Sequence, residues 1–325
     1  MRAVIITKPG GPEVLEIQDV EMPEPVADYV RVRIHAAGLN RADLLQRTGG
    51  YPAPPGSPAN IPGLEFAGEV DAVGPLVRMW KPGQRVMGLA GGGGQAEYIV
   101  IHEGLLVEIP ENLDYVQAAG IPEVFVTAYD ALFTQGRVEM GERVLIHSAG
   151  SGVDTAAIQL AHVAGAITFG TSRSPHKLKR AKSLGLDVGL SDQNFAMEIS
   201  RLTDSAGVHV VIDLVGAPYL AQNLDALALW GRLVVISIMG GAQANLNLGL
   251  IMSKRLSIRG STLRTRTLEE KLEATRRFAK HVLPLLANGK IKPIIEQVYP
   301  LEEIIKAHVA MGENRNFGKL IVSMD

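Results

Sequence analysis

The chain of 325 residues contains no cysteine. It therefore forms no disulfide, no thiolate nucleophile, no iron–sulfur cluster and no zinc site built on cysteine. Its eight histidines are scattered along the chain, without an HExxH motif or another close metal-ligand spacing. A metal ion would need ligands gathered from distant segments, so the sequence predicts no metal site.

Long apolar runs and an excess of one charge are also missing. No run approaches the ~18 residues needed to span a membrane, and MRAVIITKPG enters a strand pattern without the apolar core of a signal peptide. The 32 Lys and Arg residues nearly balance the 34 Asp and Glu residues, so no long-range field favours nucleic acid. We expect a cytoplasmic protein with neither a membrane nor a nucleic acid as partner.

The first 120 or so residues are typical of a β-rich domain. Short alternating apolar runs are separated by Gly and Pro, as in the strands of a small barrel; they are VRVRIHAAGLN, FAGEVDAVG, QRVMGLA and QAEYIVI. NRADLLQRTG predicts a short helix, and YPAPPGSPANIPG predicts a Pro-rich loop. Loops of this length in compact domains are often functional or disordered.

From about residue 122, predicted helices and strands alternate. VFVTAYDALF predicts a helix before the buried strand RVLIHS, and the alternation ends with a helix at LDALALWG (224–231) and a strand at RLVVISIMG (232–240). This order favours right-handed βαβ units and a parallel sheet. The tail from about 265 is too short for a domain, so we expect it to pack on the first one. The predicted domains are 1–121 with 266–325, and 122–265.

HSAGSGVDTAAIQLA, residues 147–161, predicts a glycine loop that leads from a strand into a helix. Backbone N–H groups and the dipole at a helix N-terminus stabilise an anion, and glycines let the backbone approach a pyrophosphate. Gly150 and Gly152 fit the first part of GxGxxG, but its sixth position is Thr155. An ordinary turn with small packing residues is the alternative. The surrounding βαβ series favours dinucleotide binding.

The segment after the second strand of this region indicates which dinucleotide. An NAD site usually carries Asp or Glu about 20 residues after the glycines, yet no carboxylate lies between Thr155 and Leu186. Hydroxyl and basic side chains, which suit a 2′-phosphate, are present instead, so the sequence favours NADP. Ser172 is a candidate donor. Lys177 lies in a first helical turn, where the dipole disfavours a cation, so it is the better phosphate ligand. We expect a solvated helix face at Lys179, Arg180 and Lys182.

Several segments, in the same order as in a known family, carry a resemblance over nearly the whole chain: NRADLLQRTGGYPAPPG, IPGLEFAGEVDAVG, GGGGQAEYIV, GIPEVFVTAYDALF, LIHSAGSGV and NRNFGKLIV. The chain resembles the zinc-free quinone oxidoreductases of the medium-chain dehydrogenase/reductase superfamily, and most of all the branch with the tumour-suppressor-inducible enzyme. The resemblance implies an α/β fold with a GroES-like β-rich catalytic domain and a Rossmann domain with a doubly wound parallel sheet that binds NADP (NADPH). It also implies a homodimer, often paired through the Rossmann sheets.

The resemblance also concerns the metal. Zinc-dependent relatives carry a Cys after the first strands and a His in a Gly-His-Glu motif. Here the corresponding stretches are AGLNRAD and Gly63-Leu64-Glu65, and Leu64 cannot bind a metal. Charge that develops on the substrate oxygen must then be stabilised by hydrogen bonds or solvent. Glu65 is expected to be structural.

Site residues follow from matching positions in the family's segments. Asn40 and Tyr51 are the implied catalytic residues, facing the nicotinamide and the quinone. The cofactor-binding candidates are Thr127 at the carboxamide, Ser151, Gly152 and Val153 at the pyrophosphate, Ser172 and Lys177 at the 2′-phosphate, Met239 and Gly240 near the nicotinamide, and Asn316 in the closing segment.

Each candidate also has a structural interpretation. Asn40 can cap the helix that starts at Arg41. Tyr51 can hold the Pro-rich loop, Thr127 can donate to a carbonyl of its own helix, and Met239 can belong to the core. The sequence leaves these alternatives open.

The chain departs from the family at two positions that concern the cofactor. Family members commonly carry Gly in place of Asp154, and often a Tyr after the third strand, where this chain has Gly189-Leu190-Ser191-Asp192. An Asp in a first helical turn is favourable by at most ~1 kcal/mol. A carboxylate ~6–8 Å from a diphosphate would cost about 2 kcal/mol at an effective dielectric constant near ~20. We therefore expect weaker NADPH binding than with glycine.

The predicted function is NADPH-dependent reduction of a quinone, by direct hydride transfer to a flat acceptor near the nicotinamide. The final proton would come from Tyr51 or water. A reductase of α,β-unsaturated carbonyls with the same cofactor site is one alternative. A non-catalytic NADPH-binding protein, as in crystallins of this family, is another.

Overall fold

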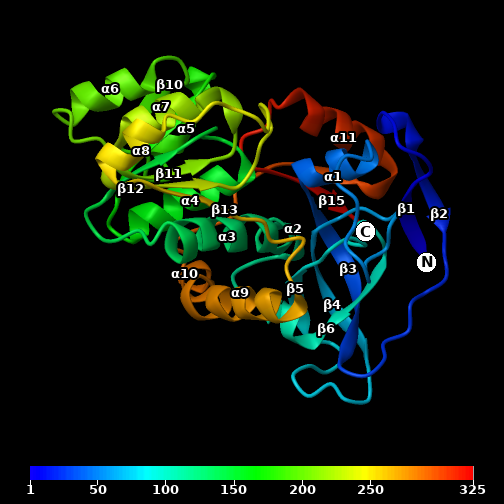
Figure 1. Ribbon diagram of the computed structural model, residues 1–325. Helices are drawn as coiled ribbons and strands as arrows, with labels where there is room; N and C mark the ends of the chain where they lie inside the picture. The colour runs from blue at the N-terminus through cyan, green and yellow to red at the C-terminus, as the bar shows by residue number, and fades with distance from the viewer. Residues whose placement is uncertain (325) are drawn as a thin grey trace. The chain divides into compact units, whose positions relative to one another are not determined.

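The computed structural model describes residues 1–324; Asp325, the last residue of the expected catalytic domain, lies outside the described residues. The chain divides into two compact units. The first unit comprises Met1–Val126 and the chain from Leu263 onward, and the second comprises Thr127–Thr262 (Figure 1). The first division falls inside helix α3 (Pro122–Tyr129), a few residues after the predicted boundary.

A twisted sheet forms the centre of the first unit, with the order β14-β15-β3-β4-β5-β7 and with β6 also paired to β3. All of its pairs are antiparallel except β14 with β15. Its strands are β3 (Tyr29–Leu39), β4 (Glu65–Val73), β5 (Arg85–Leu89), β6 (Tyr98–His102), β7 (Leu106–Glu108), β14 (Ile295–Pro300) and β15 (Lys319–Ser323). Because β14 and β15 come from the tail, the tail completes this sheet.

Shorter elements surround this sheet. A separate antiparallel ribbon pairs β1 (Arg2–Ile6) with β2 (Leu15–Asp19). The helices of this unit are η1 (Pro12–Val14), α1 (Arg41–Arg47), η2 (Glu103–Leu105), α2 (Tyr115–Ala119), α9 (Leu268–His281), α10 (Leu283–Ala287), η5 (Leu301–Glu303) and α11 (Ile304–Glu313). Among them, α2 packs on β3 and β4, and α11 packs on α1 and the β14–β15 pair. The Pro-rich segment 51–63 is irregular, as predicted.

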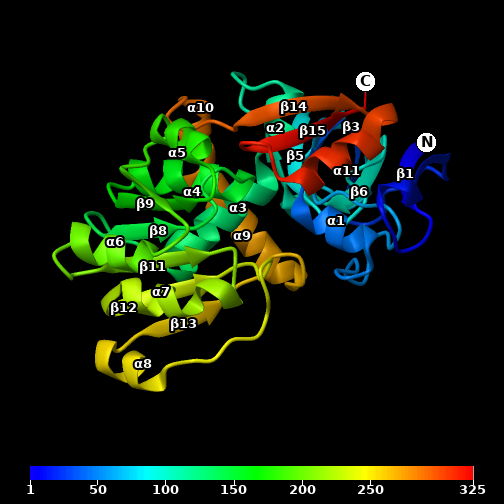
Figure 2. The same cartoon turned by 90° about the horizontal axis from the view of Figure 1, so that it is seen from above.

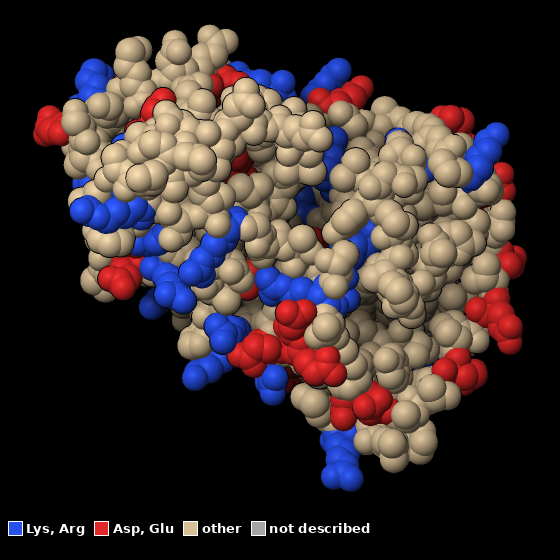
Figure 3. Space-filling view, viewed as in Figure 1, with Lys and Arg blue, Asp and Glu red and all other residues tan. Residues whose placement is uncertain are grey.

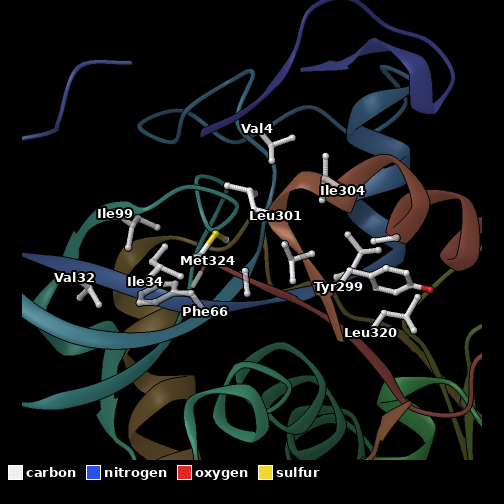
Figure 4. Close-up of a cluster of buried hydrophobic side chains, with 14 of the residues drawn as sticks. Val4, Val32, Ile34, Phe66, Ile99, Tyr299, Leu301, Ile304, Leu320 and Met324 are labelled. Atoms are coloured by element: carbon white, nitrogen blue, oxygen red, sulfur yellow. The ribbon is translucent and has the colours of Figure 1, made fainter. Parts of the chain in front are cut away.

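The core of the first unit lies around β3. Its inward residues alternate along the strand, as a half-buried strand requires, and they meet side chains from the tail. Figure 4 shows Val32, Ile34, Phe66, Ile99 and Met324 grouped together, and further along the same cluster Leu301, Ile304, Tyr299 and Leu320. Residues separated by most of the chain length thus share one apolar interior.

The second unit contains a parallel sheet with the strand order β10-β9-β8-β11-β12-β13. Figure 2 shows β9, β8, β11, β12 and β13 following one another in this order across the unit. The strands are β8 (Arg143–Ile146), β9 (Ile167–Ser172), β10 (Val188–Ser191), β11 (Val208–Asp213), β12 (Leu227–Val235) and β13 (Ser257–Gly260). This is the doubly wound strand order of a Rossmann sheet: from β8 the chain first adds strands on one side and then, from β11, on the other. It confirms the predicted fold class.

Helices connect these strands. α4 (Gly152–Val163) packs on β8 and β9, and α5 (Pro175–Lys182) packs on β9 and β10. The others are α6 (Phe195–Leu202), η4 (Ala217–Tyr219), α7 (Leu220–Ala226) and α8 (Leu248–Lys254). α3 continues into a π-helical segment, η3 (Asp130–Gln135). The helix predicted over 124–133 is therefore present, but its last four residues are π-helical.

One predicted helix is wrong in its second half. The helix expected over 224–231 ends at Ala226, and β12 begins at Leu227. Leu227 pairs with Val208 and Arg232 with Val210, so the residues between them bulge out of the ladder, with Trp230 at φ 64°. Pairing with β11 and β13 on either side overrides the helical preference of a Leu- and Ala-rich segment.

Charges of both signs are scattered over the face in Figure 3, separated by wide uncharged areas. This agrees with the formal net charge of −2. Over residues 1–324, no helix has the length and apolar character needed to cross a membrane.

Candidate functional site

The glycine loop follows β8, at the point where the sheet order reverses. Ligands of doubly wound sheets bind at this edge, outside the carboxyl ends of the strands. Gly150 has φ 130°, a conformation that side chains rarely adopt, and Ser151 is the N-cap of α4. Gly152 and Val153 form the first turn, where backbone N–H groups have no partner within the helix. The structure thus places Ser151, Gly152 and Val153 at a helix N-terminus, where the dipole and the backbone N–H groups would stabilise an anion.

Asp154 lies in the same turn, but its side chain is fully buried. Its Oδ2 accepts from the backbone N–H of Ser151 at 3.2 Å, and its own N–H donates to Ser151 Oγ at 3.4 Å. Its Oδ1 has no hydrogen-bond partner. Burial raises the pKa of this carboxyl to about 8, although Ser151 and the charge of Lys177 oppose the shift. The carboxylate charge assumed from the sequence is therefore largely absent at pH 7.

The end of β9 carries the residues expected at the adenosine ribose. Ser172 Oγ accepts from the N–H of Ser174 at 3.1 Å, and Ser174 Oγ caps α5 by accepting from the N–H of Lys177 at 3.4 Å. Lys177 is half-buried, and Arg173 is exposed. Ser172 is paired in register with Ser191 of β10.

A carboxylate lies at the end of the neighbouring strand β10. Asp192 directly follows β10, and its Oδ2 accepts from the Tyr219 hydroxyl at 3.1 Å. β10 and β9 are parallel neighbours, so Asp192 lies at the same sheet edge as the residues after β9. The absence of carboxylates between Thr155 and Leu186 does not extend to this residue, because strand pairing brings it near from further along the chain.

A buried polar network that the sequence did not reveal joins the ends of three strands. His147 Nδ1 lies 2.8 Å from Thr171 Oγ1, and its Nε2 lies 2.6 Å from Asn223 Oδ1. Asn223 Nδ2 donates to Asp213 Oδ2 at 3.0 Å. Burial lowers the His147 pKa to about 4, so the ring is neutral. Because Asn223 offers an oxygen, Nε2 carries the proton and Nδ1 accepts from Thr171. The network stiffens the edge where a cofactor would lie.

In the first unit, Asn40 belongs to a buried ion-pair cluster. Lys319 Nζ donates to Glu65 Oε1 at 2.6 Å, to Asn40 Oδ1 at 2.7 Å and to the Leu39 carbonyl at 2.6 Å. Asn40 Nδ2 donates to Glu65 Oε1 at 3.0 Å and to the Gly38 carbonyl at 3.3 Å. The Asn40 amide is thus fully engaged inside the protein. These contacts also fit the structural role predicted for Glu65.

Asn40 is the N-cap of helix α1, and Asp43, the third residue of the helix, completes a capping box with it. Asp43 Oδ2 accepts from the Asn40 N–H at 2.7 Å, and its Oδ1 accepts from the Gly63 N–H at 3.0 Å. Burial raises the pKa of Asp43 to about 6. Asp43 therefore ties the helix to the end of the Pro-rich segment.

Tyr51 is held by Arg264, a residue that the sequence did not single out. The buried Arg264 guanidinium donates to the Tyr51 and Gly91 carbonyls at 2.9 Å each, and also to Gln46 Oε1. Its carbon Cζ lies 4.9 Å from the centre of the Tyr51 ring, a cation–π contact. Burial raises the pKa of the Tyr51 hydroxyl, with Arg264 opposing the shift. The hydroxyl is thus protonated at neutral pH.

The remaining predicted residues lie on different elements of the two units. Thr127 Oγ1, in α3, is buried without a hydrogen-bond partner. Met239 and Gly240 follow β12 after a few residues, and Met239 is about half exposed rather than core. Asn316 Nδ2 donates to the Gly318 carbonyl at 2.7 Å. Their roles toward a cofactor stay predictions.

A pocket of about 1000 Å³ lies within the first unit. Pro54, Pro55 and Pro58 line it, together with the glycines 91–93 and the chain at 265–268. Neither Asn40 nor Tyr51 lines it, so this pocket does not unite the predicted catalytic residues. Among the described residues, no group of three or more His, Asp or Glu is arranged to hold a metal ion.

Known proteins match the chain over its full length. Residues 26–111 match the family described as alcohol dehydrogenase GroES-like domain, and residues 152–280 match the zinc-binding dehydrogenase family. The chain is 36% identical to a quinone oxidoreductase of Pseudomonas aeruginosa over 318 residues, 96% of each chain. It is 33% identical to one of Rattus norvegicus over 331 residues, 99% of this chain and 97% of the relative. The chain belongs to the quinone oxidoreductase family of the medium-chain dehydrogenase/reductase superfamily. It is an oxidoreductase of a small-molecule substrate, and the resemblance to the quinone oxidoreductases is confirmed.

Solved structures share the whole fold. An NAD-dependent alcohol dehydrogenase is 34% identical, with a TM-score of 0.88 and 100% of both chains covered. The CurK enoyl reductase is 30% identical, with a TM-score of 0.87 and coverage of 100% and 99%. A mycobacterial protein complexed with NADPH is 25% identical, with a TM-score of 0.90 and coverage of 99% and 100%. The likeness indicates a nicotinamide cofactor, with either NAD or NADP among the neighbours.

Proposed function

We propose that this protein is an NADPH-dependent quinone reductase that transfers a hydride to a quinone without zinc. The observation that carries the proposal is the glycine loop at the reversal point of a doubly wound sheet, with Ser172 and Lys177 after the next strand. Full-length relatives named quinone oxidoreductase support the acceptor class.

The second unit contains groups that would hold three parts of the cofactor. The N–H groups of Gly152 and Val153 and the α4 dipole would hold the pyrophosphate. Lys177 would pair with the 2′-phosphate. The orphaned hydroxyl of Thr127 is free to bond the carboxamide, which would relieve a buried unsatisfied group. Bound NADPH would supply the hydride.

The first unit would supply a proton and a rigid framework. Tyr51 is protonated at neutral pH, and it would donate its hydroxyl hydrogen to the reduced oxygen, with water as the alternative donor. The Asn40 amide, engaged with Lys319 and Glu65, would act by holding the local backbone rather than by bonding substrate.

The residue chemistry supports a reaction without zinc. The chain has no Cys, and Leu64 stands before the Glu65 carboxylate. Glu65 is already paired with Lys319, an ammonium that neutralises it. Hydrogen-bond donors such as Tyr51 would then stabilise the developing charge.

The decisive experiment mixes the protein anaerobically with NADPH and 1,2-naphthoquinone. We expect loss of absorbance at 340 nm in the presence of both protein and quinone. Absence of turnover at saturating NADPH would instead support a non-catalytic NADPH-binding protein. NADH in parallel tests the cofactor preference.

Reduction of α,β-unsaturated carbonyls is a second candidate, because an enoyl reductase shares the fold over the full chain. A panel of quinones and enones with each coenzyme separates the two. Higher kcat/KM for enones than for quinones would assign the second function.

We also propose a homodimer formed through the second unit. The edge strand β13 is exposed along its length, and the apolar residues beside it include Trp230 at 64% and Met252 at 78% exposure. Such an edge and such a patch favour association. Light scattering should give twice the 34.8 kDa chain mass, and Trp230→Glu with Met252→Glu should give the monomer. A monomeric wild type at micromolar concentration contradicts the dimer.

A further inference from the structure

Asp154 occupies an unusual environment for a carboxyl at a dinucleotide loop. It is the third residue of α4 and is fully buried. One oxygen accepts a single long hydrogen bond from Ser151, and the other oxygen has no partner. An ionised carboxylate would normally require a paired cation or several donors to be buried in this way.

Few charged groups face this carboxyl. On α4 itself the other titratable residue is His162, in the last turn, and the α4 dipole favours the anion. On β8, Arg143 lies at the opposite end of the strand, and β9 carries no charged residue. In the loop, His147 is buried and neutral. From α5, Lys177 attracts a negative charge at Asp154.

Burial therefore outweighs the hydrogen bonds from Ser151 and the attraction of Lys177, and the carboxyl is mostly protonated at pH 7. A neutral acid adds no negative charge beside a pyrophosphate. An ionised one, in the same first turn of α4, would repel it. The loop can hold Asp154 and a pyrophosphate together only while the proton is in place.

We propose that Asp154 sets the affinity of this loop for a dinucleotide through its proton, so that ionisation of Asp154 and binding of the pyrophosphate exclude each other. The inference rests on the proposed function, because it requires a dinucleotide at this loop. It replaces the constant penalty expected from the sequence with one that depends on pH.

The expected effect follows from linkage. With a pKa of about 8 in the free protein, and a bound form that keeps the proton, the dissociation constant for NADPH rises about tenfold from pH 7 to pH 9. Below pH 7 the side chain adds almost no dependence on pH.

Titration calorimetry with NADPH at pH 7, 8 and 9 tests this on three proteins. The wild type should lose about tenfold in affinity. Asp154→Asn, which keeps the shape and carries no charge, should bind as tightly as wild type at pH 7 and lose none of that affinity by pH 9. Asp154→Gly should show the same pH independence. A wild type whose pH dependence equals that of Asp154→Asn overturns the proposal.

A second measurement needs no cofactor. In protein labelled with ¹³C at the Asp side-chain carboxyl, the signal absent from Asp154→Asn identifies Asp154. It should titrate near pH 8, whereas titration near pH 4 overturns the proposal. If NADPH binds none of the proteins at any pH, the proposed function fails, and the coupling with it. Tight binding that does not change with pH rejects the coupling alone.

Discussion

Replacement of Lys319 by Met should destabilise the first unit strongly. Lys319 is 3% exposed in its side chain, and Glu65, its partner, is fully buried. Its ammonium group also bonds Asn40 Oδ1 and the Leu39 carbonyl. Methionine has a similar length, so little volume is lost, but Glu65 keeps a buried charge without a cation. Breaking one partner of a buried pair costs about 3–5 kcal/mol, and we expect the free energy of unfolding to fall by that amount.

The assay must report on the first unit alone. The chain has two tryptophans, Trp80 in the first unit and Trp230 in the second. In a Trp230→Phe background, fluorescence during urea unfolding therefore follows Trp80, which packs against the core of the first unit. The double variant Lys319→Met with Glu65→Gln removes the stranded charge, so it should recover at least half of the loss. A single-variant loss below about 1 kcal/mol would place the pair among weakly coupled surface pairs and refute the reasoning.

Three further outcomes follow from the site. Arg264→Gln should lower kcat more than it raises KM, because it releases Tyr51, and Arg264→Lys should recover only part of the lost rate. Equal kcat in the wild type and both variants would contradict a positioning role for Arg264. Lys177→Gln should weaken NADPH binding about tenfold, which corresponds to roughly 1.4 kcal/mol for one charge-assisted pair. In parallel titrations the affinity for NADH should not change, and an equal loss for both coenzymes would argue against a 2′-phosphate contact. The pKa of Asp154 is near 3.8 in the unfolded chain and near 8 in the folded protein, so between these pH values the folded state holds an extra proton. The free energy of unfolding should therefore fall by up to about 1.4 kcal/mol per pH unit as the pH rises through this range. Urea midpoints of the wild type and Asp154→Asn should differ more at one of pH 5 and pH 8 than at the other, and an equal difference at both would contradict the raised pKa.

Local patterns were sufficient to predict much of the fold. The strand–helix alternation predicted the parallel sheet because each βαβ unit is specified by contiguous sequence. The helix predicted over 224–231 was half wrong, since β12 is stabilised by neighbours distant in the chain. Helix α6 (Phe195–Leu202) was not predicted, although its apolar residues Phe195 and Ile199 recur at helical spacing.

The site was less accessible to the sequence, because its contacts are long-range. The Lys319 contacts with Asn40 cross 279 residues, and those of Arg264 with Tyr51 cross 213. No spacing rule reaches that far. The state of Asp154 depends on burial, and a helical-turn argument contains no information about depth. Arg264 could have been noticed only as a charged residue next to the apolar Leu263.

The position of β15 between β14 and β3 constrains the order in which the molecule can assemble during translation. Lys319 bonds the Leu39 carbonyl 280 residues upstream, so β3 emerges from the ribosome long before its neighbour exists. The second unit, by contrast, is complete once residue 262 has emerged. Because domains tend to fold as units when synthesised, the second unit should reach its native state while residues 36–39 of β3 still lack β15 as their partner strand. During that interval this part of the β3 edge is open to chaperones.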